Sequence, residues 1–131
     1  MNEIKIIECP RDAMQGIKPF IPTEKKVKYI QSLLRVGFDT IDFGSFVSPK
    51  AIPQMQDTAE VLAQLDLSAT SSKLLAIIAN TQGAQNASIY NEIQYLGFPF
   101  SISENFQMRN THKTIAESLV TLQEILEIAD Q

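Results

Sequence analysis

The sequence has few of the residues that build disulfides and zinc sites. It contains one cysteine, Cys9, and one histidine among 131 residues. A single cysteine excludes a disulfide within the chain, and one Cys with one His cannot supply a Cys/His zinc site. The same scarcity suits a reducing cytoplasm. Because Cys9 ends an apolar run, we expect a packed structural thiol rather than a nucleophile.

Long apolar runs and clusters of basic residues are lacking as well. No apolar stretch reaches the roughly 20 residues that span a bilayer, and the first residues lack the basic-then-apolar order of a signal peptide. The net charge of −4, with no Lys/Arg cluster, argues against a nucleic-acid-binding surface. We therefore expect one cytoplasmic domain that binds neither membranes nor nucleic acid.

The chain does contain a repeated alternation of short apolar runs and amphipathic helical patterns. The helical patterns have apolar residues at helical spacing, and the last begins with the capping box Thr114–Glu117. A glycine, Gly37, ends the first helical pattern. The alternation predicts strands near 4–9, 40–43, 74–79 and 98–103, and helices over 23–36, 57–65, 85–96 and 114–129.

This alternation predicts an α/β fold with a parallel sheet covered by helices. Doubly wound sheets and (β/α)₈ barrels both fit the pattern. No glycine-rich phosphate loop follows the first run, and polar residues recur where each strand ends, which favours the barrel because barrel enzymes place their chemistry at that rim. These polar residues are Arg11, Asp12, Asp42, Ser45, Asn80, Ser103 and Glu104. We expect them at one end of a sheet ordered 1-2-3-4.

The adjacent charges Arg11 and Asp12 follow the apolar run in "IKIIECPRDAMQG" (4–16). Opposite charges at the end of a buried strand cost desolvation energy unless something there uses them. The alternative is a solvated surface turn. The recurrence of polar residues at the other strand ends favours a functional site.

The length of the chain does not suffice for a complete barrel. Such a barrel takes about 250 residues, whereas this sequence of 131 residues supplies four βα units. We expect residues 1–131 to be the N-terminal half of a (β/α)₈ barrel catalytic domain whose remainder is absent from this chain. The uncovered strand edges then favour association.

Two segments carry a resemblance to a known family. "IKIIECPRDAMQG" followed by "IDFGSFVSPKAIPQM" (41–55) resembles the start of 3-hydroxy-3-methylglutaryl-CoA lyase, a member of the metal-dependent barrel lyases and carboxyltransferases. "SENFQMRNTHKTIAES" (103–118) resembles the loop and helix start after the family's fourth strand. The resemblance implies cleavage of 3-hydroxy-3-methylglutaryl-CoA to acetyl-CoA and acetoacetate in leucine degradation, with Mg²⁺ or Mn²⁺, by a homo-oligomer in the complete protein.

The resemblance also implies roles for individual residues. Asp12 matches the metal-binding aspartate, and Arg11 would stabilise the charge on the thioester carbonyl. Asp42 stands where the family carries glutamate and would orient Arg11 or a metal-bound water; a polar strand-end residue is the alternative. Asn80, Asn110 and Thr114 would bind the acyl-CoA, although Thr114 is equally explained as a plain N-cap.

Parts of the family's site have no match in these residues. The paired histidines of the metal site and the catalytic cysteine are not matched, and Cys9 does not correspond to that cysteine. Two alternatives therefore remain beside the lyase. One is a related Claisen-condensing acyltransferase or carboxyltransferase, and the other is a non-catalytic half-barrel that works through association.

Overall fold

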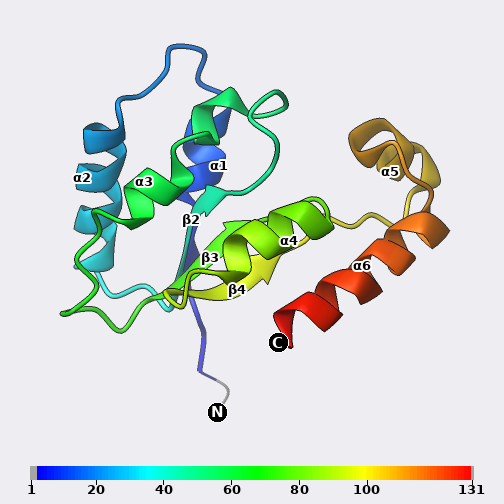
Figure 1. The fold of residues 1–131 in the computed structure, drawn as a ribbon. Helices are drawn as coiled ribbons and strands as arrows, with labels where there is room; N and C mark the ends of the chain where they lie inside the picture. Colours follow the sequence, from blue (N-terminus) through cyan, green and yellow to red (C-terminus); the bar gives the residue numbers. More distant parts are fainter. Residues whose placement is uncertain (1–2, 131) are drawn as a thin grey trace.

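The computed structural model describes residues 3–130 and consists of one parallel sheet with helices (Figure 1). All four strands pair in parallel in the order β1-β2-β3-β4, which confirms the predicted α/β fold and strand order. In chain order the elements are β1 (Ile7–Glu8), α1 (Pro10–Gln15), α2 (Thr23–Leu34), β2 (Thr40–Ser45), the 3₁₀ helix η1 (Pro53–Met55), α3 (Thr58–Leu62), β3 (Lys73–Ile77), α4 (Thr81–Ser88), β4 (Ile93–Gly97), α5 (Glu104–Thr111) and α6 (Ile115–Ala129).

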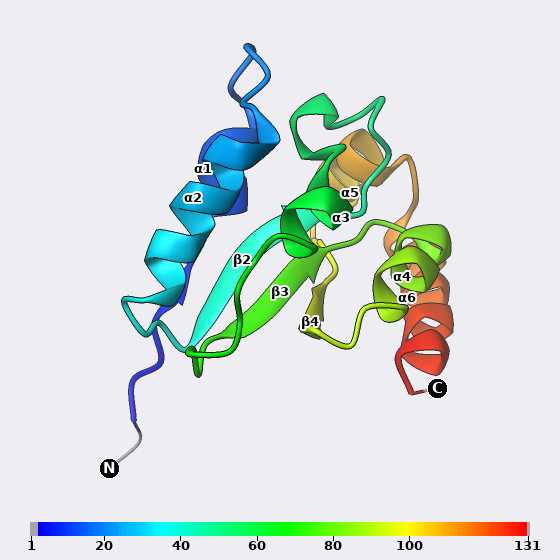
Figure 2. The same cartoon turned by 60° about the vertical axis from the view of Figure 1, so that its left-hand side comes forward.

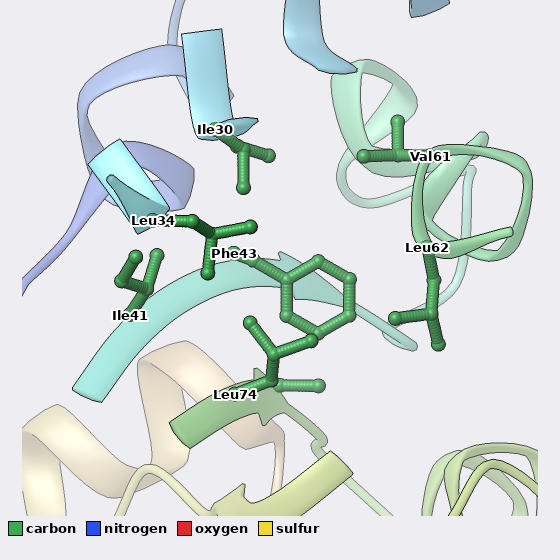
Figure 3. Close-up of a cluster of buried hydrophobic side chains, with 8 residues drawn as sticks. Ile30, Leu34, Ile41, Phe43, Val61, Leu62 and Leu74 are labelled. Carbon is green, nitrogen blue, oxygen red and sulfur yellow. The ribbon is translucent and has the colours of Figure 1, made fainter. Parts of the chain in front are cut away.

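The main core lies between the helices and one face of β2 and β3. Apolar residues of α2 and α3 pack on that face, as Figure 3 shows. Ile30 and Ile41 are fully buried there. The cluster consists of Ile30, Leu34, Ile41, Phe43, Val61, Leu62, Leu74 and Ala76. A second cluster of Ile78, Ala84, Ala87 and Ile125 packs α4 and α6 beside it.

The opposite face of the sheet carries no helix among the described residues. Side chains alternate between the faces of a strand, so Leu75 points away from the core that contains Leu74 and Ala76. Ile7, Thr40, Leu75, Tyr95 and Leu96 line a shallow hollow on this side; we call it the open face. Figures 1 and 2 show α2, α3, α4 and α6 along the other side. No helix between residues 3 and 130 is long and apolar enough to cross a membrane.

The fourth strand lies earlier in the chain than the sequence predicted. It runs over Ile93–Gly97, not 98–103, and the helix expected over 85–96 is α4, Thr81–Ser88. The Asn80 side chain accepts a hydrogen bond from the Gly83 N–H and so starts this helix early. Ile93 and Leu96, which fall within the helix predicted over 85–96, instead pack against the core from the strand.

The first apolar run was predicted to be a strand buried on both faces, and this is wrong. Only Ile7–Glu8 forms a strand, and Ile4 and Ile6 are 88% and 60% exposed. Because β1 pairs only with β2 among the described residues, one edge of it stays open. Cys9 was expected to be packed but is exposed, since it stands at the N-cap position of α1, outside the sheet. Partial burial, and then the charge of Asp42, raise the pKa of the Cys9 thiol, which disfavours a nucleophile.

The segment before the last helix forms a helix that was not predicted. α5 spans Glu104–Thr111 and ends at His112, whose φ of 55° is left-handed. Asn110 therefore belongs to α5. The sequence suggested instead that it stands at the start of the last helix, α6. The capping box of α6 is confirmed, because Thr114 Oγ1 accepts from the Glu117 N–H and the Thr114 N–H donates to Glu117 Oε2.

This capping box predicts a pH dependence of stability. Hydrogen bonds from the Thr114 N–H, and then its hydroxyl, lower the pKa of Glu117. A carboxylate with a lowered folded-state pKa stabilises the fold above its ordinary pKa of about 4.3, and this contribution is lost as the pH falls through the lowered value. We expect Glu117→Gln to shift the urea midpoint downward at pH 7 and much less at pH 3. Glu124→Gln, on the exposed side of the same helix, should shift neither.

Candidate functional site

Arg11 and Asp42 come from neighbouring strand units and meet at the carboxyl end of the sheet. α1 follows β1 directly, with Pro10 in its first turn, so Arg11 lies just beyond the strand. Asp42 lies within β2 and not at its end as predicted, and it is buried. The pairing of β2 with β3 shifts by one residue between Asp42 and Gly44, a bulge of the kind that redirects side chains beside functional sites.

The Arg11 guanidinium is held by Asp42 along one edge. Nε donates to both carboxylate oxygens at 3.1 Å, and Nη2 donates to Oδ2 at 2.6 Å. The two side chains are 13% and 6% exposed, so the pair is largely shielded from water. Burial lowers the pKa of Arg11, but the hydrogen bonds and charge of Asp42 outweigh it and leave that pKa raised. The guanidinium is thus a permanent positive charge in a fixed orientation.

The other edge of Arg11 faces Gln15 and Asp12. Nη1 donates to Gln15 Oε1 at 2.8 Å and lies 3.4 Å from Asp12 Oδ1. The Asp12 side chain is 68% exposed and therefore accessible. A carboxylate is the ligand that Mg²⁺ and Mn²⁺ prefer, but residues 3–130 contain no group of three or more His, Cys, Asp or Glu placed to hold an ion. These residues alone do not fit a complete metal site.

A cavity of about 720 Å³ opens beside this cluster. Arg11, Asp12 and Asn110 all line it, so the structure brings three of the predicted site residues together. Its charged side is formed by α1 and an apolar side by the loop after β2, and the segment after β4 contributes both aromatic and polar side chains. The other lining residues are Gln15, Val47, Ala51, Ile52, Ile77, Ala79, Pro99, Phe100, Ser101, Phe106, Gln107 and Thr111. A cavity with one charged wall and one apolar wall suits an acyl group that carries a carbonyl or carboxylate.

Three predicted site residues do not line this cavity: Asp42, which is linked to it only through Arg11, and the two residues Asn80 and Thr114. Asn80 caps α4 and Thr114 caps α6, and in each case the side-chain oxygen accepts a backbone N–H three residues ahead. Both residues follow the carboxyl side of the sheet, as does Ser103, which caps α5. Asn80 and Asp12 therefore lie at the same end of the sheet, as predicted. These cap hydrogen bonds account for the amide oxygen of Asn80 and the hydroxyl oxygen of Thr114. A ligand-binding role for either residue stays a prediction.

Sequence reasoning missed two glutamines that line the cavity. Gln15 holds the Nη1 edge of Arg11, and its position four residues after Arg11 on one helix face could have revealed the pair. Gln107 is 2% exposed, accepts the Ser101 N–H at 2.9 Å and donates to Ser118 Oγ at 2.6 Å. It joins α5 to α6. A lone glutamine in a polar segment gives no signal of such burial.

Comparison with known proteins finds similar chains of one kind. No protein-family model matches the sequence. A mitochondrial hydroxymethylglutaryl-CoA lyase from Bos taurus is 36% identical over 131 residues, with 98% of this chain and 39% of the relative covered. A solved HMG-CoA lyase from Bacillus subtilis is similar with a TM-score of 0.89 and 32% identity, over 98% of this chain and 43% of that one.

A further solved structure bears on the ligand. It is an HMG-CoA lyase from Acinetobacter baumannii in complex with coenzyme A and 3-methylmalate, with a TM-score of 0.86 and 35% identity over 94% of this chain and 40% of that one. The fold of residues 3–130 thus matches part of the lyase barrel, as predicted. The chain spans between 25% and 43% of the length of the curated relatives it matches, and these include mitochondrial and cytoplasmic proteins.

Proposed function

Because this chain is homologous to the N-terminal part of the hydroxymethylglutaryl-CoA lyases, we propose that it supplies the corresponding part of a carbon–carbon lyase site. The reaction cleaves 3-hydroxy-3-methylglutaryl-CoA to acetyl-CoA and acetoacetate in the cytoplasm. The observation that carries the proposal is the cavity in which Arg11, held by Asp42, stands beside Asp12 and opposite an apolar wall. Residues 1–131 form the first four βα units of the barrel in this proposal.

Arg11 acts on the thioester carbonyl. When the bond between C2 and C3 of the substrate breaks, its electrons move toward the thioester and negative charge develops on the carbonyl oxygen. A positive group that cannot lose its proton stabilises this charge without donating a proton. Asp42 is a positioning residue, because its bonds to Nε and Nη2 leave the guanidinium one orientation toward the cavity. The C3 hydroxyl loses its proton to a base, and C2 of the resulting enolate gains a proton to give acetyl-CoA; both transfers need groups other than these residues.

In this proposal Asp12 would supply one oxygen ligand to a Mg²⁺ or Mn²⁺ ion. The ion would polarise oxygens of the substrate when it is bound. A complete site would need further ligands, because residues 3–130 contain no group of three or more His, Cys, Asp or Glu that could hold an ion. Asp12 alone is expected to bind a divalent cation weakly, because one carboxylate offers a hard cation few of its required oxygens.

Asn110 places an amide on the acyl-CoA side of the cavity. Its Nδ2 donates to the Phe106 carbonyl within α5, which leaves Oδ1 for a ligand donor. We expect Asn110→Ala to weaken binding of 3-hydroxy-3-methylglutaryl-CoA by about tenfold, the value of one hydrogen bond. Calorimetric titration of the chain would measure this. Asn105→Ala, an exposed position of the same helix that does not line the cavity, is the matched control, and equal losses in both variants would contradict the assignment.

A further inference from the structure

A second buried polar cluster lies outside the cavity, formed by Lys26, Gln54 and Asp57. Lys26 Nζ donates to Asp57 Oδ1 at 2.6 Å and to the Gln54 carbonyl oxygen. Lys26 and Asp57 are only 2% and 7% exposed. Thr23 Oγ1 donates to the second Asp57 oxygen at 2.7 Å, and the Phe20 ring lies 4.1 Å from Lys26 Nζ. Asp57 stands at the N-cap position of α3 but makes no side-chain cap hydrogen bond, because its carboxylate binds these partners.

A buried ion pair is costly, which makes its presence here informative. Removing two charges from water costs several kcal/mol, and a well-packed apolar pair is often as stable. Neither Lys26 nor Asp57 reaches the cavity, so the proposed reaction does not use their charges directly. The ion pair instead connects two elements, because Lys26 lies on α2 and Asp57 immediately precedes α3.

Gln54 extends this connection to the chain between α1 and α2. Its Nε2 donates to the carbonyls of Ile17 and Pro19 at 2.7 and 3.0 Å, and its Oε1 accepts the Ile21 N–H at 2.9 Å. Gln54 is 3% exposed. The Gln54 side chain thus makes three hydrogen bonds to residues 17–21, which form neither helix nor strand.

The two segments joined by the cluster continue into two walls of the cavity. Arg11 and Gln15 line one wall from α1, directly before residues 16–22, whereas Ala51 and Ile52 line the other from the loop that leads into η1, which contains Gln54. No backbone–backbone hydrogen bond links segment 10–22 to segment 46–57. The described hydrogen bonds between these two segments are all made by the Gln54 side chain, to Ile17, Pro19 and Ile21.

We propose that Lys26, Gln54 and Asp57 are positioning residues that set the separation of the two cavity walls. The cluster acts through α1 and the loop after β2, and it touches no substrate. Binding of the acyl group then depends on a side chain, Gln54, that lies behind the wall. The inference rests on the proposed function for its ligand, whereas the coupling between the two loops is independent of it.

Gln54→Met, which keeps the volume and removes all three side-chain hydrogen bonds, tests this proposal in the full chain. We expect faster amide exchange in residues 10–21 and 47–52, unchanged exchange in β2 and β3, and binding of 3-hydroxy-3-methylglutaryl-CoA weakened by about tenfold well below the unfolding temperature. Gln31→Met is the matched control. Gln31 likewise joins two segments through both of its amide atoms, to the Asp66 N–H and carbonyl, but far from the cavity.

The outcomes separate this inference from the proposed function. The two variants are compared at equal loss of Tm. If Gln54→Met weakens acyl-CoA binding no more than Gln31→Met does, the cluster has a merely structural role and the inference is overturned. If the unmodified chain does not bind the acyl-CoA, the proposed function fails for this chain, and the exchange data alone decide the coupling. Should Gln54→Met not fold, the double variant Lys26→Met/Asp57→Leu removes the ion pair without leaving a lone buried charge. Unchanged exchange on α1 in that variant also overturns the inference.

Discussion

Replacing Arg11 with lysine is expected to lower kcat by about 100-fold or more, while KM changes by less than about tenfold. The change keeps the positive charge but removes the fork that binds Asp42 through Nε and Nη2. A lysine ammonium can pair with Asp42 or reach the thioester oxygen, but it cannot do both in one fixed geometry. The charge that Arg11 stabilises is fully developed only in the transition state, so the loss falls on kcat.

The measurement needs a complete barrel. We suggest a chimera in which residues 1–131 replace the matching 43% of the Bacillus subtilis lyase, with acetoacetate release followed in a coupled assay. Arg109→Lys is the matched control, because Arg109 is an exposed arginine on α5 that does not line the cavity. A kcat of Arg11→Lys equal to that of Arg109→Lys would show that Arg11 only supports the structure.

The parallel sheet and the position of the charged pair could be predicted from the sequence. Apolar strand-length runs between amphipathic helices leave few arrangements other than a covered parallel sheet, and the carboxyl ends of parallel strands share one edge. Arg11 and Asn80 follow their strands in the chain, so their placement at one end required no knowledge of packing. The capping box of α6 is a local pattern and was equally readable.

Features that depend on distant partners could not be predicted. Lys26 looks like a solvated residue of an amphipathic helix, because nothing in the sequence links it to Asp57, which lies 31 residues away. Gln107 gives no signal either, because its burial follows from the packing of α5 against α6 and not from a local pattern. The fourth strand was misplaced because Ile93 and Leu96 fit helical spacing as well as they fit a strand with an irregular register, and the pairing of β3 with β4 does shift there.

The open face of the sheet leads to the second large effect. Residues 1–131 alone are expected to show no detectable lyase turnover and to self-associate as their concentration rises. Apolar side chains are exposed on this face and along both sheet edges, among them Ile7 at 52% and Tyr95 at 41%, and such surfaces drive association. Adding the part of the Bacillus subtilis lyase that follows the matched region should restore a defined assembly and activity together. Light scattering and the acetoacetate assay, on separate and mixed polypeptides, would measure both.

The variant Ile7→Lys distinguishes association that closes the barrel from non-specific hydrophobic association. Ile7 lies on the edge strand β1 and lines the open face together with Leu75 and Tyr95. A lysine there should reduce self-association and also prevent rescue by the added polypeptide, because the same edge and face must be covered to close the sheet. Val36→Lys, at an exposed apolar residue outside the sheet, should leave rescue intact. A monodisperse, active monomer of residues 1–131 would contradict the half-barrel proposal, because a site with one carboxylate ligand and one bound arginine would then suffice for the reaction.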